Sequence, residues 1–545
     1  MTAQISIGAI DYAIVGIYFL FVIAVGYLLK KQMVTSEDFF LAGHRIPAWV
    51  TGLAFMSANL GALEVMGMAA NGVQYGMMTA HFFWVGAIPA MVFLSVFMMP
   101  FYYGSKVRSV PEFLKMRFNE PTRALNAVSF AVMTVLMSGI NLYAMALVFK
   151  LLLNWDMNGS ILIAAGVVLV YTMLGGLSSS IYNEVIQFFL IVFGLLPISI
   201  IGLMKYGGFD GLRKALPDPA FMHLWSATGT AHNPMGVDWL GILSGLGFVL
   251  SFGYWCTDFL VIQRALAAQD LPAAQRTPLI AAFPQMLFPL VTVMPGLLAI
   301  LMIPGIGTNT TTLSPNMAMP LLIAKLYPAG MLGVGLTAML ASFMSGMAGN
   351  VTAFNTVWTY DLYQSYIAKN KSDAHYLWMG RVATAAGIVI SIATSYLVMR
   401  FASIMDYMQL IFGFFNAPLF ATFLLGMFWK RTSPWGAFWG LVCGILTAIL
   451  HYFLTVQGTF HFPSEMAGNF WRATIAWTSC FVITIAISFF TKPKPESELW
   501  GLCWGLTNQA EQRRLPACSL PWYKRPAILG VIVLVITTVL NIAFW

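Results

Sequence analysis

An apolar run from Ile46 to Ala70 carries one carboxylate, Glu64, within the stretch SANLGALEVMG (57–67). A charged side chain costs about 2.5–3.5 kcal/mol at the centre of a bilayer, so such residues usually face a cavity or a partner. Gly61 and Gly67 flank the carboxylate and favour an interruption of the helix. The stretch therefore predicts a helix that breaks inside the membrane. Glu64 would either project into a solute cavity or pair with a neighbouring helix.

Oxygen-bearing side chains also occur in later apolar segments. In MLASFMSGMAGNVTAFNTVWTYDLY (339–363), Ser342 and Ser345 are three residues apart and share one helix face. Hydroxyl and carbonyl oxygens suit a hard cation such as Na⁺, although serines inside helices also bond to their own backbone. Glu184, in GGLSSSIYNEVIQ (175–187), is a second carboxylate that could hold an ion or extend to the membrane surface.

Two aromatic residues, Tyr254 and Trp255, lie in SFGYWCTDFLVIQR (251–264), beside a predicted helix break. They could close over a small polar ligand, or they could belong to an aromatic belt at the membrane surface. The sequence contains no His/Cys metal cluster, phosphate-binding glycine loop or nucleophile elbow. It therefore favours passage of a solute over an enzymatic reaction, with an ion gradient as the energy source.

The elements that must position these residues are membrane helices. The 545-residue chain is 59% hydrophobic and 9% charged, with a mean hydropathy of +0.78. A soluble domain contains about 25% charged residues, so the composition excludes a soluble protein. Apolar stretches long enough to span a bilayer predict fourteen helices, at 10–29, 47–71, 79–104, 123–149, 159–175, 179–204, 237–263, 279–303, 327–364, 377–400, 403–428, 434–456, 468–491 and 526–544.

The distribution of Lys and Arg orients these helices. With the N-terminus outside, 21 of the 28 basic residues fall on the inner side and 7 on the outer side. We therefore expect a multi-pass cell-membrane protein whose termini both face outward. The same asymmetry accounts for the net charge of +8 without a nucleic-acid partner. The five cysteines match no metal-ligand spacing or disulfide framework, and no organic cofactor or obligate protein partner is expected.

The second helix has a counterpart five helices later, where Gly241, Gly245, Gly247 and Gly253 suggest another interruption. Paired interruptions are typical of inverted-repeat transporters, although glycines also permit close helix packing. The expected organisation is an extra N-terminal helix (1–30), a first repeat (46–204), a second repeat (237–428) and C-terminal helices (434–545) with an inner loop at about 492–525.

Several of these stretches resemble motifs of the sodium:solute symporter family, and within it the sodium/glucose cotransporter branch. In family order they are EDFFLAGHRIPAW (37–49), VPEFLKMRF (110–118), TMLGGLSSSIYNEVIQ (172–187), YWCTDFLVIQRAL (254–266), MLASFMSG with YDLY (339–363), DYMQ (406–409), FWKRTSPWGAFWGL (428–441) and the late ELWGLCWGL (498–506). The resemblance implies an all-α polytopic membrane protein with about fourteen transmembrane helices and a ten-helix core of two inverted five-helix repeats. Helices 2 and 7 would be broken, and inward Na⁺ flow would drive solute uptake by alternating access.

The resemblance also implies a sodium site. Its oxygens would be the backbone carbonyls of Ser57, Leu60 and Ser342 and the hydroxyl of Ser345. The family usually has a second hydroxyl where this chain has Gly346, so weaker sodium binding, a substituting water or another ion remain alternatives. Glu184 matches an acidic position that the family links to ion release or to a second sodium site.

For the solute, the positions that match sugar contacts or gates are Asn59, Tyr254, Trp255 and Gln409. Glu64 stands where sugar-transporting relatives have Gln or His. A family Glu near the start of helix 3 is missing from HFFWVG (81–86), where His81 is the nearest polar side chain, and Gln285 replaces a family Lys. A pocket with these changes need not prefer glucose or galactose.

The predicted function is therefore a Na⁺-coupled symporter that imports a small neutral polar solute, foremost a monosaccharide such as glucose or galactose. A symporter of the same family for a polyol, an amino acid, a carboxylate or a cationic metabolite is the first alternative. A receptor or channel built on a transporter fold is the second.

Overall fold

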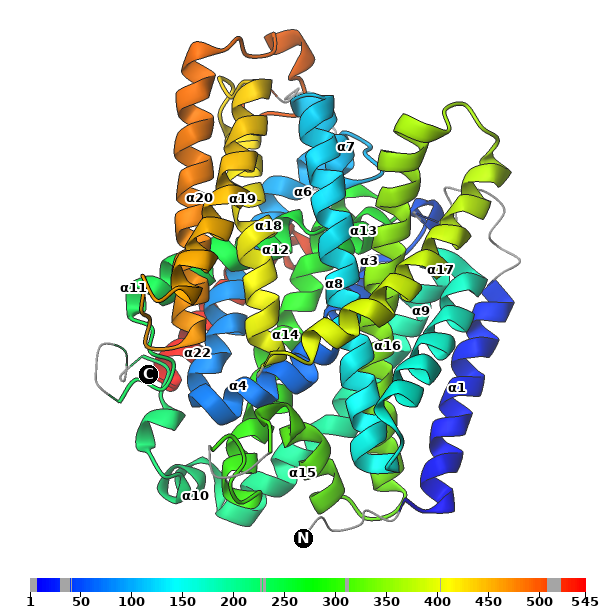
Figure 1. Ribbon diagram of the computed structural model, residues 1–545, viewed down its shortest axis with the longest axis vertical. Helices are drawn as coiled ribbons and strands as arrows, with labels where there is room; N and C mark the ends of the chain where they lie inside the picture. Colours follow the sequence, from blue (N-terminus) through cyan, green and yellow to red (C-terminus); the bar gives the residue numbers. More distant parts are fainter. Residues whose placement is uncertain are drawn as a thin grey trace.

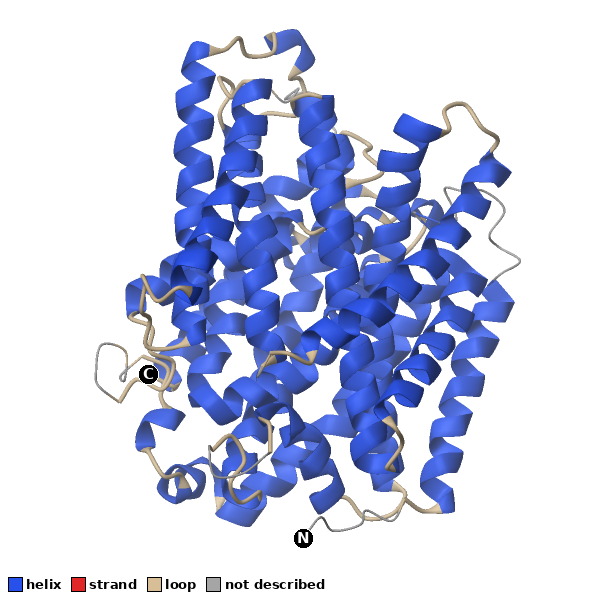
Figure 2. Cartoon of the chain, viewed as in Figure 1, coloured by secondary structure: helices blue, strands red, loops and turns tan. Residues whose placement is uncertain are grey.

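The computed structural model describes residues 7–29, 40, 42–225, 228, 232–308, 313–401, 403–506 and 521–545. Every regular element in these ranges is helical, apart from a single β-bridge between Ile46 and Ala268 (Figure 2). The all-α architecture predicted from the apolar pattern is confirmed. Parts of three predictions lie outside the described residues: 1–6 and 30 of the N-terminal unit, 37–39 and 41 of the first motif, and 507–520 of the inner loop.

In the described part, twelve helices are long and apolar enough to cross a membrane, and a bent helix pair and a shorter apolar helix match the remaining two predicted segments. The helices that contribute to these spans are α1 (Ala9–Leu29), α3 (Ala48–Asn59), α4 (Met68–Tyr75), α5 (Ile88–Phe93), α6 (Met99–Gly104), α8 (Glu120–Leu153), α9 (Met157–Tyr206), α11 (Trp239–Gly241), α12 (Ser251–Thr257), α13 (Phe259–Leu266), α14 (Leu271–Met302), α16 (Met331–Thr356), α17 (Asp373–Val398), α18 (Ile404–Phe428), α19 (Pro434–Val456), α20 (Glu465–Phe490) and α22 (Pro526–Ala543). Shorter helices between them are α7 (Val110–Arg117), α10 (Gly208–Ala215) and α15 (Ala318–Leu326).

The helix α9 joins two segments that were predicted as separate. No proline lies between its two apolar parts, Met157–Val170 and Leu177–Tyr206, and helical hydrogen bonding continues from one to the other. A straight helix of 50 residues would extend about 75 Å, more than twice the thickness of about 30 Å of the hydrocarbon core. The element therefore corresponds to two membrane segments.

The first interruption lies where the glycine-containing stretch predicted it. The helix α3 ends at Asn59, and Leu60 leaves the helical conformation with φ −75° and ψ 46°. The chain then resumes as a wide π-helical segment, Leu63–Gly67, that leads into α4. The two parts are bent by 60°. Gly67 lies inside the second part, so the break is confined to residues 60–62.

The second interruption is at Asp258, where φ −74° and ψ 122° separate α12 from α13. The sequence suggests an interruption among the preceding glycines and beside Tyr254 and Trp255, and the break lies three residues after Trp255. A Cβ at Gly245 would lie 2.8 Å from the backbone oxygen of Phe470, and one at Gly253 would lie 2.9 Å from that of Asn416. These glycines permit close helix packing, whereas the Asp258 carboxylate caps α13 by accepting a 2.9 Å hydrogen bond from the Leu260 amide.

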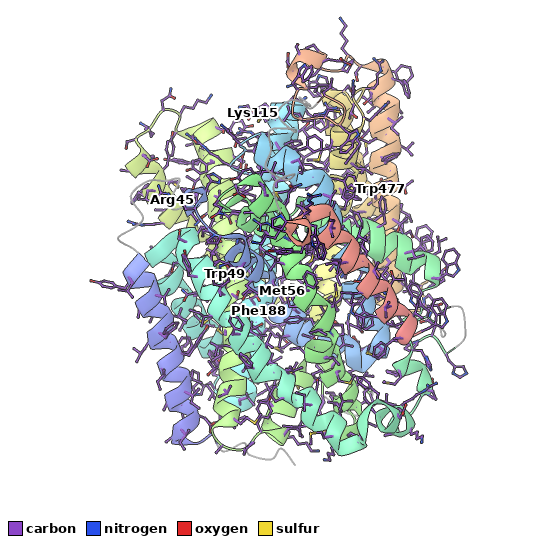
Figure 3. The ribbon with its side chains drawn as sticks, turned by 180° about the vertical axis from the view of Figure 1, so that it is seen from behind. Arg45, Trp49, Met56, Lys115, Phe188 and Trp477 are labelled. Carbon is purple, nitrogen blue, oxygen red and sulfur yellow. The ribbon has the colours of Figure 1, made fainter. Side chains whose placement is uncertain are left out.

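The broken helices lie in the interior of the bundle. In the span Trp239–Thr257, which ends at the second break, 67% of the most apolar stretch is buried inside the protein, whereas in α1 and α22 only 22% is. The pair α19 and α20 forms one edge of the molecule and α1 forms the opposite edge (Figure 1). From behind, α3 runs inward from Trp49, which is 58% exposed, to the fully buried Met56 near the centre (Figure 3). The break therefore occurs deep within the protein, against α14 and α16.

Candidate functional site

A cavity of about 60 Å³ lies where the second part of the first broken helix meets α12, α14 and α18. Its polar lining consists of Asn59, Glu64, Ser251, Tyr254, Gln285 and Gln409, and Phe82, Phe83, Trp255 and Phe412 supply aromatic surface. Six of the seven predicted solute-binding residues, Asn59, Glu64, Tyr254, Trp255, Gln285 and Gln409, thus line one cavity. Ser251, one helical turn before Trp255, also lines the cavity, and no motif in the sequence indicates it.

Three hydrogen-bond acceptors in this cavity have no partner. They are Oε2 of Glu64, Oε1 of Gln285 and Oε1 of Gln409, and all three atoms are buried. Buried polar atoms without a partner are rare in native proteins, because each one costs free energy comparable to a lost hydrogen bond. Three unpartnered oxygens thus belong to residues around one cavity.

The carboxylate of Glu64 faces this cavity. It comes from the π-helical segment Leu63–Gly67 that follows the break, and wide helical turns of this kind occur frequently at functional sites. One of its oxygens is buried without a hydrogen-bond partner. The arrangement agrees with the first of the two interpretations of Glu64, in which the carboxylate projects into a solute cavity.

The floor of the cavity is a contact between the two broken helices. The hydroxyl of Tyr254 donates a hydrogen bond to the side-chain oxygen of Asn59, whose amide nitrogen donates in turn to the Phe55 carbonyl at 2.7 Å. The Tyr254 ring stacks on Phe412, with 4.9 Å between the ring centroids. A second cavity of about 30 Å³ adjoins the first, because Asn59, Leu63, Met137 and Tyr254 line both.

Trp255 forms part of the wall. Its ring stacks on Phe55 of α3, with 5.7 Å between the centroids and an interplanar angle of 24°. Only 5% of the residue is exposed. The stacking fixes α12 against α3, and it excludes the alternative that Trp255 belongs to an aromatic belt at the membrane surface.

His81 does not line the cavity. Its Nε2 lies 2.9 Å from the Leu224 carbonyl oxygen, and its ring packs on Trp225 with 4.3 Å between the centroids. The next two residues, Phe82 and Phe83, direct their rings to the cavity instead. His81 was predicted to bind the solute because it is the polar residue nearest in sequence to the missing family Glu. In the structure its imidazole points instead toward Leu224 and Trp225, in the segment after α10.

The four predicted sodium-site residues come together at the first break. The Ser345 hydroxyl donates to the Ser57 carbonyl at 2.9 Å, and the Ser342 hydroxyl donates to the Leu60 carbonyl. All four residues are fully buried. The Ser57 carbonyl also accepts a hydrogen bond from the Leu60 amide at 2.9 Å. Carbonyl and serine hydroxyl oxygens are neutral hard donors, which fit a monovalent hard cation. The donor set is therefore suited to Na⁺ as the transported ion.

Glu184 has a different environment from the one predicted. Its two carboxylate oxygens accept hydrogen bonds from the Arg264 guanidinium, one at 2.5 Å and the other at 3.3 Å. The Ser180 hydroxyl also donates to it, at 2.7 Å. The ion pair is buried and joins α9 to α13. The sequence left Glu184 open between ion binding and a position at the membrane surface, and it gave no sign of Arg264, 80 residues away, as its partner.

Comparison with known proteins places the chain among transporters. The family model described as "Sodium:solute symporter family" matches residues 39–444. The sodium/glucose cotransporter 1 of Oryctolagus cuniculus is 28% identical over 550 residues, which cover 93% of this chain and 82% of that protein. The sodium/myo-inositol cotransporter 2 of the same species is 27% identical and covers 91% of this chain and 78% of that protein.

Solved structures show the same fold. A Na⁺-coupled sialic acid symporter in a substrate-bound outward-open state aligns with a TM-score of 0.75 at 20% identity, over 89% of this chain and 99% of that chain. The broken helices, the apolar bundle and the family match agree with one another. The chain belongs to the sodium:solute symporter family, whose members are transporters rather than enzymes.

Proposed function

We propose that this protein imports a small, neutral, hydroxyl-rich solute together with Na⁺, and that the solute is a monosaccharide such as glucose or galactose. The observation that carries the proposal is the group of three unpartnered oxygens of Glu64, Gln285 and Gln409 around one cavity. Sugar hydroxyls can donate to all three, and the Gln amide nitrogens can donate to sugar oxygens. The aromatic part of the lining suits the apolar face of a sugar ring.

The sodium site and the solute cavity share one structural element. In the proposed mechanism, Na⁺ binds the carbonyl oxygens of Ser57, Leu60 and Ser342 and the Ser345 hydroxyl. The hydroxyl hydrogens of Ser342 and Ser345 would then turn away from the carbonyls to which they now donate. Binding would hold the break of the first helix against α16, and Asn59 and Glu64 adjoin that break on either side. The cation would thereby order the solute cavity before the solute arrives.

The contact between Tyr254 and Asn59 is proposed as the inner gate. Solute release toward the second cavity requires this hydrogen bond to break and the Tyr254 ring to leave Phe412. Glu184 and Arg264 would hold α13 against α9 until the inner side opens. In this proposal Glu184 takes part in ion release through its ion pair with Arg264.

The same orientation is proposed for the termini as in the sequence prediction. The Asp11 carboxylate in α1 accepts hydrogen bonds from the Gly330 and Gly333 amides at the start of α16. At the other end of the chain, the Trp545 carbonyl accepts from the Trp225 amide. Both contacts involve segments that the distribution of basic residues assigns to the outer side.

Independence from an organic cofactor and from an obligate protein partner remains a prediction.

A polyol is the second candidate solute. The resemblance to a sodium/myo-inositol cotransporter favours it, and a polyol presents the same hydroxyl donors to the three free oxygens. A carboxylate solute is disfavoured because it would face Glu64. A cationic metabolite would pair with Glu64, but unless it also carried hydroxyl groups it would make few hydrogen bonds to Gln285 and Gln409.

Uptake into proteoliposomes tests the proposal. Radiolabelled glucose, galactose, myo-inositol, proline, lactate and choline are supplied with an inward Na⁺ gradient or with choline chloride of equal ionic strength (lithium chloride when choline is the solute). We expect Na⁺-stimulated uptake of a sugar, or of myo-inositol if the second candidate is correct. Uptake of choline alone, or the absence of Na⁺ stimulation for every solute, would overturn the proposal.

A further inference from the structure

The sodium group contains a contact that leaves no room for a side chain at position 346. A Cβ at Gly346 would lie 2.8 Å from the Cα of Gly61 and 2.9 Å from Oδ1 of Asn141. Real Cβ atoms essentially never approach other heavy atoms so closely. The space next to Ser345 is therefore filled by the unwound backbone of the first broken helix and by one carboxamide from α8.

Asn141 is fixed at this junction by both ends of its amide. Its Oδ1 accepts a 2.9 Å hydrogen bond from the Ala62 amide, within the break. Its Nδ2 donates to the Met137 carbonyl one turn earlier in α8, at 3.4 Å. The residue is only 3% exposed. The same Oδ1 would lie 2.8 Å from a Cβ at Gly61, so this oxygen sits directly between the break and α16.

The chemistry of this oxygen suits a monovalent cation. An amide carbonyl oxygen has two lone pairs, of which the Ala62 amide uses one. Asn carbonyl oxygens bind hard cations in proteins. Because the amide is neutral, it can lie beside the Ser57 and Leu60 carbonyls without adding charge to a buried site.

We propose that the Asn141 carboxamide oxygen belongs to the sodium site and replaces the hydroxyl that is absent at Gly346. This inference rests on the proposed Na⁺-coupled function and names a ligand that the sequence motifs did not indicate. It also brings α8 into the site, which otherwise consists of the first break and α16. Met137 of α8 lines both cavities, so the helix that holds the ion also borders the solute.

The test measures Na⁺ binding by the purified full-length protein. The melting temperature is recorded over a NaCl titration in which choline chloride keeps the ionic strength constant. Asn141→Leu keeps the side-chain volume but removes the oxygen, and we expect the half-saturating Na⁺ concentration to rise about tenfold or more, because a buried hydrogen-bonding or coordinating group is lost. Asn141→Asp keeps an oxygen in the same place, and we expect its half-saturating concentration to equal the wild-type value or fall below it.

Asn126→Ala is the matched control, because this buried residue lies on the same helix and lines a separate cavity with Phe415 and Asn416. We expect its Na⁺ titration to match that of the wild type. A second comparison uses Gly346→Ser alone and together with Asn141→Ala. Both variants should bind Na⁺ poorly, because a Cβ at position 346 also meets the Cα of Gly61, a contact that Asn141→Ala leaves in place.

The outcomes separate this inference from the function on which it rests. A wild-type protein with no Na⁺-specific rise in melting temperature and no Na⁺-stimulated uptake would contradict the proposed function itself. If the wild type responds to Na⁺ and Asn141→Leu lowers the melting temperature equally in NaCl and in choline chloride, with an unchanged half-saturating concentration, Asn141 has only a structural role. That result would overturn the inference. Should Asn141→Leu fail to fold, a normal Na⁺ titration of Asn141→Ala, with Gly346 unchanged, would overturn it equally.

Discussion

The Tyr254 hydroxyl donates a hydrogen bond to the Asn59 side chain, and this bond connects the two interrupted helices at the boundary between the two cavities. Asn59 is the last residue of α3 before the first break, and Tyr254 lies four residues before the second. In the proposed mechanism the breaks supply backbone oxygens to the ion, and they bring Asn59 and Tyr254 together at the first cavity. A change in this hydrogen bond would therefore affect both broken helices.

Removal of the Tyr254 hydroxyl should weaken the inner gate. Tyr254→Phe keeps the ring that stacks on Phe412 but loses the hydrogen bond to Asn59. A net contribution of about 1 kcal/mol for such a bond corresponds to an increase of about fivefold in the open population. Efflux of preloaded solute from proteoliposomes without Na⁺ should rise by a similar factor. Tyr396→Phe, at the periphery of α17, should behave like the wild type; efflux that is equal in all three proteins would show that this contact is not a gate.

Truncation of Glu64 should affect solute binding more than folding. Glu64→Ala removes an acceptor from the cavity, and the loss of a hydrogen bond to a charged group, about 1.5–3 kcal/mol, predicts a KM for solute about 10- to 150-fold higher. Glu64→Gln, which keeps one acceptor, should show a smaller increase. The measurement is the concentration dependence of Na⁺-driven uptake at matched expression. Loss of expression in both variants would instead support a structural role for Glu64.

Loss of the Ser345 hydroxyl should act on the ion. Ser345→Ala removes a sodium oxygen while leaving the solute lining intact. We expect the half-saturating Na⁺ concentration for uptake to rise about tenfold or more, as for other lost buried polar contacts. Ser391→Ala is the control, since that hydroxyl bonds to the Gly387 carbonyl of its own helix. An unchanged Na⁺ dependence in Ser345→Ala would remove Ser345 from the sodium site.

The buried ion pair of Glu184 and Arg264 should contribute to stability as a unit. Removing one partner leaves an uncompensated buried charge and costs about 3–5 kcal/mol, whereas replacing both partners by apolar residues is often close to neutral. Glu184→Leu and Arg264→Met should each lower the melting temperature by several degrees, and the double variant should lower it less than either. If Glu184 were mainly a sodium ligand, its variant would instead change the Na⁺ titration while leaving the melting temperature in choline chloride unaffected.

The apolar pattern predicted the helices well because burial in a bilayer leaves a strong signal in the sequence. Asn59, Leu60 and Ser57 could also be placed near a break, since glycines and a carboxylate lie in the same apolar run. The position of the second break could not be predicted from its glycines. The helix is interrupted there at Asp258. Its carboxylate caps α13 by accepting a hydrogen bond from the Leu260 amide, and this contact exists only once the new helix has started.

Long-range partners are the features that the sequence did not reveal. Arg264 pairs with Glu184 across 80 residues, and Asn141 reaches Ala62 across 79; neither spacing carries a local pattern. His81 was assigned to the solute site from its distance along the chain, but the rotation of the helix start directs it to Leu224. Packing between helices decides these positions, and it becomes visible only in three dimensions.

The most direct test of the central claim is the coupling between the ion and the solute in the purified protein. The dissociation constant of galactose is measured in NaCl and in choline chloride at equal ionic strength, and that of Na⁺ is measured with and without galactose. A cation that orders the first break should tighten galactose binding about tenfold, and galactose should tighten Na⁺ binding by the same factor, because such coupling is reciprocal. Galactose binding of equal affinity in the two salts would contradict the claim that the cation at the break prepares the cavity for its solute.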